Sequence, residues 1–90
     1  MRPSSDALER LKVAAHRAVG TNRTAKAISA GVAQVVFIAK DADRRVVGEV
    51  VSAAAARGLE VVEVDSMREL GRACGIAVGA ASAAIVNPAS

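Results

Sequence analysis

The sequence predicts an α/β sandwich, in which helices cover a sheet and successive crossovers are right-handed. Three observations predict it. Apolar, β-prone runs alternate along the chain with segments of helical periodicity. Helix-capping residues and glycines separate these segments. Hydrophobic residues make up 52% of the 90 residues, which suits one folded domain with an adequate core and excludes a disordered chain.

The first expected element is a helix that follows a loose end at residues 1–5. Either Ser5 or Asp6 can cap this helix. Its apolar positions recur at helical spacing, at Leu8, Leu11 and Ala15. Residues 18–20 can then form only a very short strand.

A second helix is expected to begin near Asn22 and to stop at Gly31, which is typical of a C-terminal cap. The next segment, residues 35–39, is a continuous run of β-prone apolar residues. Such a run is typical of a strand that is buried on both faces.

The third helix is expected after the acidic residues Asp41 and Asp43, either of which can cap it. Its apolar stripe comprises Val46, Val47, Val50, Val51 and Ala54. Gly58 ends the helix, and residues 59–64 form the next strand.

Ser66 and Glu69 have the spacing of a capping box and predict a fourth helix. The apolar side of that helix comprises Leu70, Ala73 and Cys74. The glycines spaced by four, Gly71, Gly75 and Gly79, are expected to cap and turn the chain, with Gly75 closing the helix. Residues 81–86 form the last strand.

The charges are unevenly distributed along the chain, whose formal net charge is +3. Residues 1–40 carry seven basic and two acidic side chains, whereas residues 41–90 carry five and seven. Between Glu9 and Asp41 there are six basic residues and no carboxylate. This asymmetry predicts a basic face and favours a polyanionic partner.

No arrangement of residues predicts an enzyme, a metal site or a cofactor. Cys74 is on an apolar helix side and is expected to be a small core residue, and His16, the only imidazole, is far from it in sequence. Asp41 and Asp43 are better explained as helix caps than as metal ligands. The sequence has neither a P-loop nor a Gly-rich dinucleotide fingerprint.

The single cysteine, together with the absence of an apolar signal segment or membrane span, predicts a cytoplasmic protein without membrane contact.

Residues 20–26, Gly-Thr-Asn-Arg-Thr-Ala-Lys, are the most informative stretch. Gly20 can adopt backbone conformations that other residues avoid, and Thr21 and Asn22 are good N-cap types. Asn22 and Lys26 are four residues apart and project from one helix face. A helix start that is not capped offers free N–H groups to phosphate.

These side chains are suited to a folded RNA rather than to stacked single strands. Phe37, the only aromatic residue, lies in an expected core strand and is not available for base stacking. Lys26 can donate to guanine acceptors, and the Asn22 amide can both donate and accept. Base edges become readable where an RNA duplex is bent or opened.

Three blocks resemble one known family: residues 20–27 (GTNRTAKA), 39–43 (AKDAD) and 70–81 (LGRACGIAVGAA). In this order and spacing they are similar to the kink-turn-binding ribosomal proteins of the L7Ae and L30e family, most closely to its short bacterial members. The resemblance extends from about Asp6 to Val86. It implies a three-layer α-β-α sandwich around a four-stranded mixed sheet, formed by a single domain.

The resemblance also implies a partner and a site. The partner is structured RNA, possibly ribosomal, whose tandem sheared G·A pairs bend the duplex sharply, and the protein is expected to be a ribosome-associated monomer. Against the G·A pairs and nearby phosphates lie Gly20, Thr21, Asn22 and Lys26. Covering the flipped-out loop nucleotide are Ile76, Ala77 and Val78. Beside that base are Asp43 and Val47.

Three residues depart from the family pattern. Arg23 and Ala77 stand where the family commonly has glutamate, and Arg44 replaces a frequent proline. A carboxylate can accept a hydrogen bond from a guanine amino group, whereas arginine cannot. We expect Arg23 to bind phosphate instead, which gives more affinity and less selectivity.

Two alternatives remain open on the sequence. One is a protein-interaction module of the same fold, associated with the ribosome or the transcription machinery and with weak RNA affinity. The other is a substrate-recognition domain related to those fused to RNA methyltransferases. Salt dependence separates an RNA clamp from a mostly apolar protein contact, because only the RNA clamp loses affinity steeply with salt.

Overall fold

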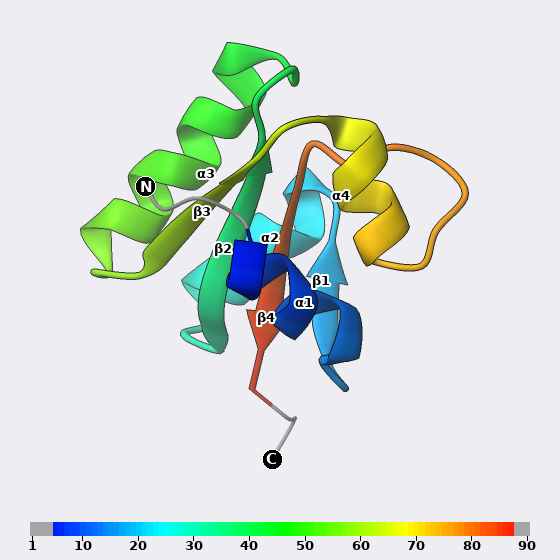
Figure 1. Ribbon diagram of the computed structural model, residues 1–90. Helices are drawn as coiled ribbons and strands as arrows, with labels where there is room; N and C mark the ends of the chain where they lie inside the picture. Colours follow the sequence, from blue (N-terminus) through cyan, green and yellow to red (C-terminus); the bar gives the residue numbers. More distant parts are fainter. Residues whose placement is uncertain (1–4, 88–90) are drawn as a thin grey trace.

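The computed structural model describes residues 5–87 and confirms the predicted α/β sandwich (Figure 1). The elements are α1 (Ser5–Val13), β1 (Arg17–Val19), α2 (Thr21–Ser29), β2 (Ala33–Ala39), α3 (Arg44–Ala56), β3 (Glu60–Val64), α4 (Met67–Ala73) and β4 (Ser82–Val86). The expected loose end at residues 1–5 lies outside the described residues except at Ser5, where α1 begins.

The four strands form one mixed sheet in the order β1-β4-β2-β3. β4 is antiparallel to both β1 and β2, whereas β2 and β3 are parallel. A parallel pair needs a crossover, and α3 provides it. α1 packs beside α4 and α2 packs beside α3, so that one pair of helices covers each face of the sheet (Figure 1).

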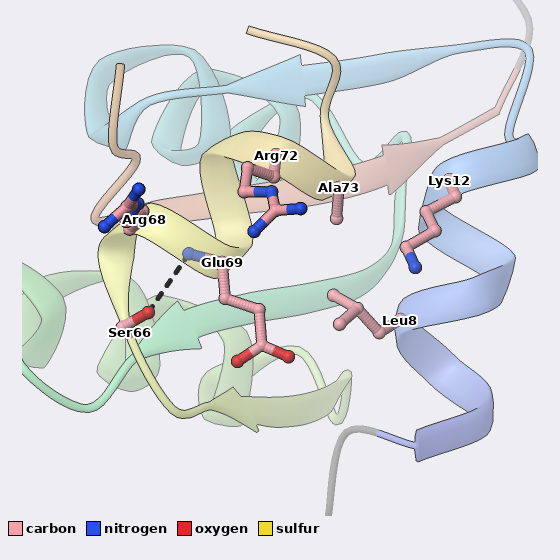
Figure 2. A pocket seen from close by; sticks show the side chains of 7 residues that line it. All are labelled: Leu8, Lys12, Ser66, Arg68, Glu69, Arg72 and Ala73. Carbon is pink, nitrogen blue, oxygen red and sulfur yellow. Dashed lines mark hydrogen bonds between the residues drawn. The ribbon is translucent and has the colours of Figure 1, made fainter. Parts of the chain in front are cut away.

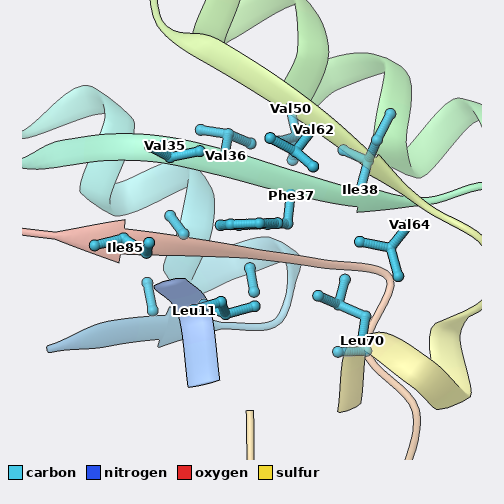
Figure 3. Packing of buried hydrophobic residues seen from close by; sticks show 14 of the residues in the cluster. Leu11, Val35, Val36, Phe37, Ile38, Val50, Val62, Val64, Leu70 and Ile85 are labelled. Atoms are coloured by element: carbon cyan, nitrogen blue, oxygen red, sulfur yellow. The ribbon is translucent and has the colours of Figure 1, made fainter. Parts of the chain in front are cut away.

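The core is centred on β2, where the predicted apolar run, residues 35–39, is buried throughout. Phe37 is fully buried, and Figure 3 shows it in a cluster with aliphatic side chains from the surrounding elements. The same cluster includes Leu11 of α1, Val50 of α3 and Leu70 of α4. The only aromatic ring of the chain is therefore a core residue and is not exposed to a nucleic-acid base.

The first helix is shorter than expected. It ends at Val13, and Ala15, predicted to continue its apolar stripe, lies outside it and is exposed. The physical reason is a contact from the next strand. Arg17 Nη1 donates to the carbonyl oxygens of Leu11 and Lys12, at 3.2 and 3.3 Å, and so satisfies two acceptors at the C-terminal end of the helix.

The third helix is capped by Asp43 rather than Asp41, because Asp43 Oδ1 accepts from the Arg45 amide at 2.8 Å. Its buried stripe is narrower than predicted: Val47 and Val50 are buried, but Val46 is exposed. Successive residues on a helix differ by about 100° in direction, so Val46 falls on the solvent side of the stripe.

Candidate nucleic-acid interface

Three segments that are distant in sequence meet at one edge of the sheet. The Gly20 amide donates to the Ser82 carbonyl at 2.9 Å, and the Ala39 amide donates to the Ala81 carbonyl at 2.9 Å. These two bonds align the end of β1, the end of β2 and the start of β4. The start of α2, the β2–α3 loop and the α4–β4 loop therefore lie together, in the upper part of Figure 1. We call this surface the sheet-edge surface.

The N-terminus of α2 lacks a side-chain cap. Gly20, with φ 94° and ψ 157°, is the N-cap residue, and no side chain accepts from the first turn. Thr21 and Asn22, expected as N-cap types, are the first two helical residues instead. A φ of this sign favours glycine, which explains why Gly20 takes the cap position. The first-turn N–H groups are consequently available to an anion.

The polar side chains of this turn are also available. Asn22, Arg23 and Lys26 are exposed, and within residues 5–87 their side chains make no hydrogen bond or ion pair. The first turn of α2 contains no acidic residue. Asn22 and Lys26 lie one turn apart on the same helix face, as their spacing predicts. The result is a donor-rich helix end without a competing carboxylate of its own.

One pair of hydroxyl groups joins the start of this helix to the sheet. Thr21 Oγ1 lies 3.2 Å from Ser82 Oγ, which is fully buried at the start of β4. Thr24 is also fully buried, but its Oγ1 has no hydrogen-bond partner in the part of the chain that the structure describes.

These two threonines give opposite predictions for the free energy of unfolding. Thr24→Val should raise it by about 1 kcal/mol, because an unsatisfied buried hydroxyl is replaced by a methyl group of similar shape. Thr21→Val should lower it by about 1 kcal/mol, because it leaves the buried Ser82 hydroxyl unpaired. Urea denaturation of both variants measures the difference, and equal effects of the two changes would contradict this account.

The β2–α3 loop is anchored at both ends. Asp43 caps α3, and Asp41 Oδ1 accepts from the Met67 amide of α4 at 2.7 Å. Lys40 Nζ lies 3.7 Å from Glu63 and 3.4 Å from Asp65, so carboxylates already balance its charge. Of the two residues expected beside the flipped base, Asp43 is exposed, whereas Val47 is only 4% exposed and lies beneath the surface.

The α4–β4 loop presents the predicted apolar residues to solvent. Ile76 is 36% and Val78 71% exposed, and Ala77 between them is also exposed. The loop is held at its start because the Ile76 amide donates to the Gly71 carbonyl at 3.1 Å. It is held at its end because the Ala80 amide donates to the Met67 carbonyl at 3.0 Å. Exposed apolar side chains on an anchored loop are suited to covering a ligand.

The glycines of this region have two different roles. Gly75, with φ 76°, follows the C-cap residue Cys74 and closes α4 as predicted. Gly71 and Gly79 do not turn the chain but allow close packing. A Cβ atom at Gly71 would lie 2.1 Å from the Val78 carbonyl oxygen, and one at Gly79 would lie 3.1 Å from Met67 Cβ. The loop therefore rests directly on α4.

Two contacts of the sheet-edge surface could not be found from sequence patterns. The Thr21–Ser82 pair joins residues far apart in the chain, and Ser82 carries no local signal. Of the two candidate caps for α3, Asp41 instead accepts from the Met67 amide at the start of α4. Ser66 was correctly predicted: its Oγ accepts from the Glu69 amide at 3.0 Å.

Cys74, the only thiol, lies in the core rather than on the sheet-edge surface. Cys74 is buried, and burial raises the pKa of its thiol, an effect that the charge of Arg17 partly offsets. Residues 5–87 contain no group of three or more His, Cys, Asp or Glu side chains placed to hold a metal ion. Within the same range no helix has the length and apolar character needed to cross a membrane.

Fold and surface together define an α/β sandwich with a basic helix end and an exposed apolar loop side by side. The chain belongs to the ribosomal protein L7Ae/L30e/S12e/Gadd45 family, whose family model matches residues 4–90. This match confirms the family resemblance drawn from the three sequence blocks.

Similar proteins come from bacteria, archaea and eukaryotes. The chain is 42% identical to an RNA-binding protein of Geobacillus sp. (strain WCH70) over 79 residues. The aligned region covers 88% of this chain and 96% of that protein. It is 45% identical over 84 residues to the large ribosomal subunit protein eL8 of Halobacterium salinarum, covering 89% and 70% of the two chains. The solved structure of a Giardia lamblia 15.5kD RNA binding protein superposes with a TM-score of 0.83 at 31% identity, covering 94% of this chain and 74% of that one.

Proposed function

We propose that this protein is a non-catalytic, ribosome-associated RNA-binding protein that recognises kink-turn RNA through the sheet-edge surface. One observation carries the proposal: an uncapped, acid-free helix start with free polar side chains lies beside an exposed apolar loop. A kinked RNA presents both kinds of target, namely exposed purine edges with close phosphates and an unstacked base. The relatives named RNA-binding proteins and the ribosomal subunit protein support it.

Each segment has a separate task in this proposal. Asn22 and Lys26 contact the edges of the sheared G·A pairs, while Gly20 and Thr21 bring the free N–H groups close to phosphate. Ile76, Ala77 and Val78 cover the flipped-out nucleotide and exclude water from it. Asp43 lies beside that base, and Val47 supports the surface from below.

The test is a titration of a short kink-turn RNA and of a matched duplex whose G·A pairs are converted to Watson–Crick pairs, at two salt concentrations. Tight binding to the kink-turn alone is expected. Equal and salt-sensitive binding to both RNAs would show a general backbone binder. Binding to neither would overturn the proposal and favour the protein-interaction module.

Arg23 provides a prediction on selectivity. Its guanidinium is exposed next to the free helix end and is expected to bind phosphate without reading sequence. Arg23→Glu removes this phosphate contact from both RNAs and should reduce the salt slope by about 1. On the kink-turn the new carboxylate can accept from a guanine amino group, so binding to the matched duplex should weaken more than binding to the kink-turn. Titrations of both RNAs at several salt concentrations measure this. An equal loss for the two RNAs would contradict this prediction, because it would show that a carboxylate at position 23 makes no contact with the G·A pairs.

A further inference from the structure

A second basic surface lies between α1 and α4, beyond the sheet-edge surface. An open groove of about 700 Å³ separates the two helices and is lined by Leu8, Lys12, Ser66, Arg68, Glu69, Arg72 and Ala73. Figure 2 shows three cationic side chains succeeding one another across it: Arg68 and Arg72 from α4, and Lys12 from α1. We call it the α1–α4 groove.

The two arginines have no side-chain partner in the part of the chain that the structure describes. Both are exposed, and neither side chain makes a hydrogen bond or ion pair among residues 5–87. Lys12 Nζ lies 3.2 Å from Glu9 Oε1, three residues earlier in the same helix. Both side chains are exposed, and an exposed ion pair of this kind is weak, so an external anion can compete for Lys12. All three cations therefore remain available to an external anion.

The arginines border the apolar loop directly. On α4 the loop rests on Met67 and Gly71, as the Ala80–Met67 bond and the Gly71–Val78 contact show. Arg68 and Arg72 each follow one of these residues by one position, so they form the next stripe around the helix, about 100° away. The α1–α4 groove is thus continuous with the sheet-edge surface through α4.

We propose that the α1–α4 groove binds the phosphate backbone of an RNA strand that continues past the apolar loop. This inference rests on the proposed function and extends its footprint. Two arginines at i,i+4 project side by side, and with Lys12 they can follow successive phosphates of one strand. The half-buried Glu69 carboxylate lies among these cations and opposes the same phosphates.

The experiment compares a minimal kink-turn RNA with one whose stems and loop strand are lengthened. The Arg68→Gln/Arg72→Gln variant should bind the minimal RNA like the parent protein. It should bind the long RNA on the order of tenfold more weakly, with a salt slope reduced by about 1–2. Arg10→Gln is the control for the loss of one cation outside the groove, to be compared with Arg68→Gln and Arg72→Gln made singly. Arg10 is exposed on α1 and points about 200° away from the positions of Leu8 and Lys12.

A second variant, Glu69→Gln, is expected to raise the affinity for the long RNA instead of lowering it. Glu69→Gln removes the opposing carboxylate but keeps the backbone amide that donates to Ser66 Oγ at 3.0 Å. It should therefore bind the long RNA more tightly than the parent protein, without loss of stability in a thermal melt. Unchanged or weaker binding would contradict the proposal.

The outcomes separate the two proposals. If the parent protein prefers the kink-turn but gains no affinity from the longer RNA, or if the double variant equals the parent on it, the groove inference fails while the proposed function stands. If the parent protein binds neither RNA, both fail.

Discussion

Gly71→Ala is expected to lower the free energy of unfolding by about 2–3 kcal/mol, the upper range for overpacking a core. Its new Cβ atom would lie 2.1 Å from the Val78 carbonyl oxygen, a backbone atom that cannot rotate away. Alanine has a helix propensity about 1 kcal/mol better than glycine, but this gain is smaller than the cost of displacing the loop. The melting temperature should fall by roughly 10–20 °C, measured by circular dichroism.

Gly48→Ala is the control for this substitution. Gly48 lies inside α3, and a Cβ atom there would meet nothing within 4 Å. The same chemical change should therefore raise the free energy of unfolding by about 0.5–1 kcal/mol. If both variants were stabilised, the close approach of the α4–β4 loop to α4 would be wrong.

Lys26→Ala is expected to weaken kink-turn binding by about 1–3 kcal/mol, the range for losing a specific contact to a base. The Lys26 ammonium has no partner among the described residues, so its removal should leave the free energy of unfolding nearly unchanged. The loss should be larger for the kink-turn than for the matched duplex, because the duplex hides its guanine edges. Titration of both RNAs, with a thermal melt of the variant, measures this.

Arg10→Ala serves as the charge-matched control. Arg10 is exposed on α1, which lies on the other face of the sheet from α2. It changes the net charge by the same amount but should alter kink-turn affinity only slightly. If the two variants lost the same affinity, the Lys26 effect would reflect overall charge rather than a specific contact.

The sequence predicted the elements well because their signals are local. The β2 run, the caps at Asp43 and Ser66, and the glycine at the end of α4 all act within a few residues of the structure they specify. These signals were sufficient to predict four helices and a mixed sheet once combined with the family resemblance.

The sequence was less informative where a distant residue decides a local conformation. α2 has no side-chain cap, and the Thr21 hydroxyl, a good capping group, is paired with Ser82 across the fold. α1 stops early because Arg17 satisfies its last carbonyls from the next strand. Gly71 was expected to cap or turn the chain, but it lies within α4, and the α4–β4 loop packs directly against it.

In the candidate site, too, local features were predictable from the sequence, whereas features that depend on distant residues were not. The exposed face with Asn22 and Lys26 follows from helix periodicity, and Ile76 and Val78 are exposed on the α4–β4 loop. The burial of Val47 depends on how α3 packs against its neighbours, which periodicity alone does not define. The arginines of the α1–α4 groove are brought near Lys12 only by the packing of α1 beside α4, which the sequence pattern does not show.

The most direct test of the sheet-edge surface is a map of backbone amide chemical shifts during titration with kink-turn RNA. The largest changes are expected together in residues 20–26, 40–43 and 75–81, which the fold brings to one edge of the sheet. Residues 57–60, at the end of α3 and the start of β3, should remain unchanged. Changes centred on residues 57–60, or confined to only one of the three segments, would contradict a single composite RNA surface.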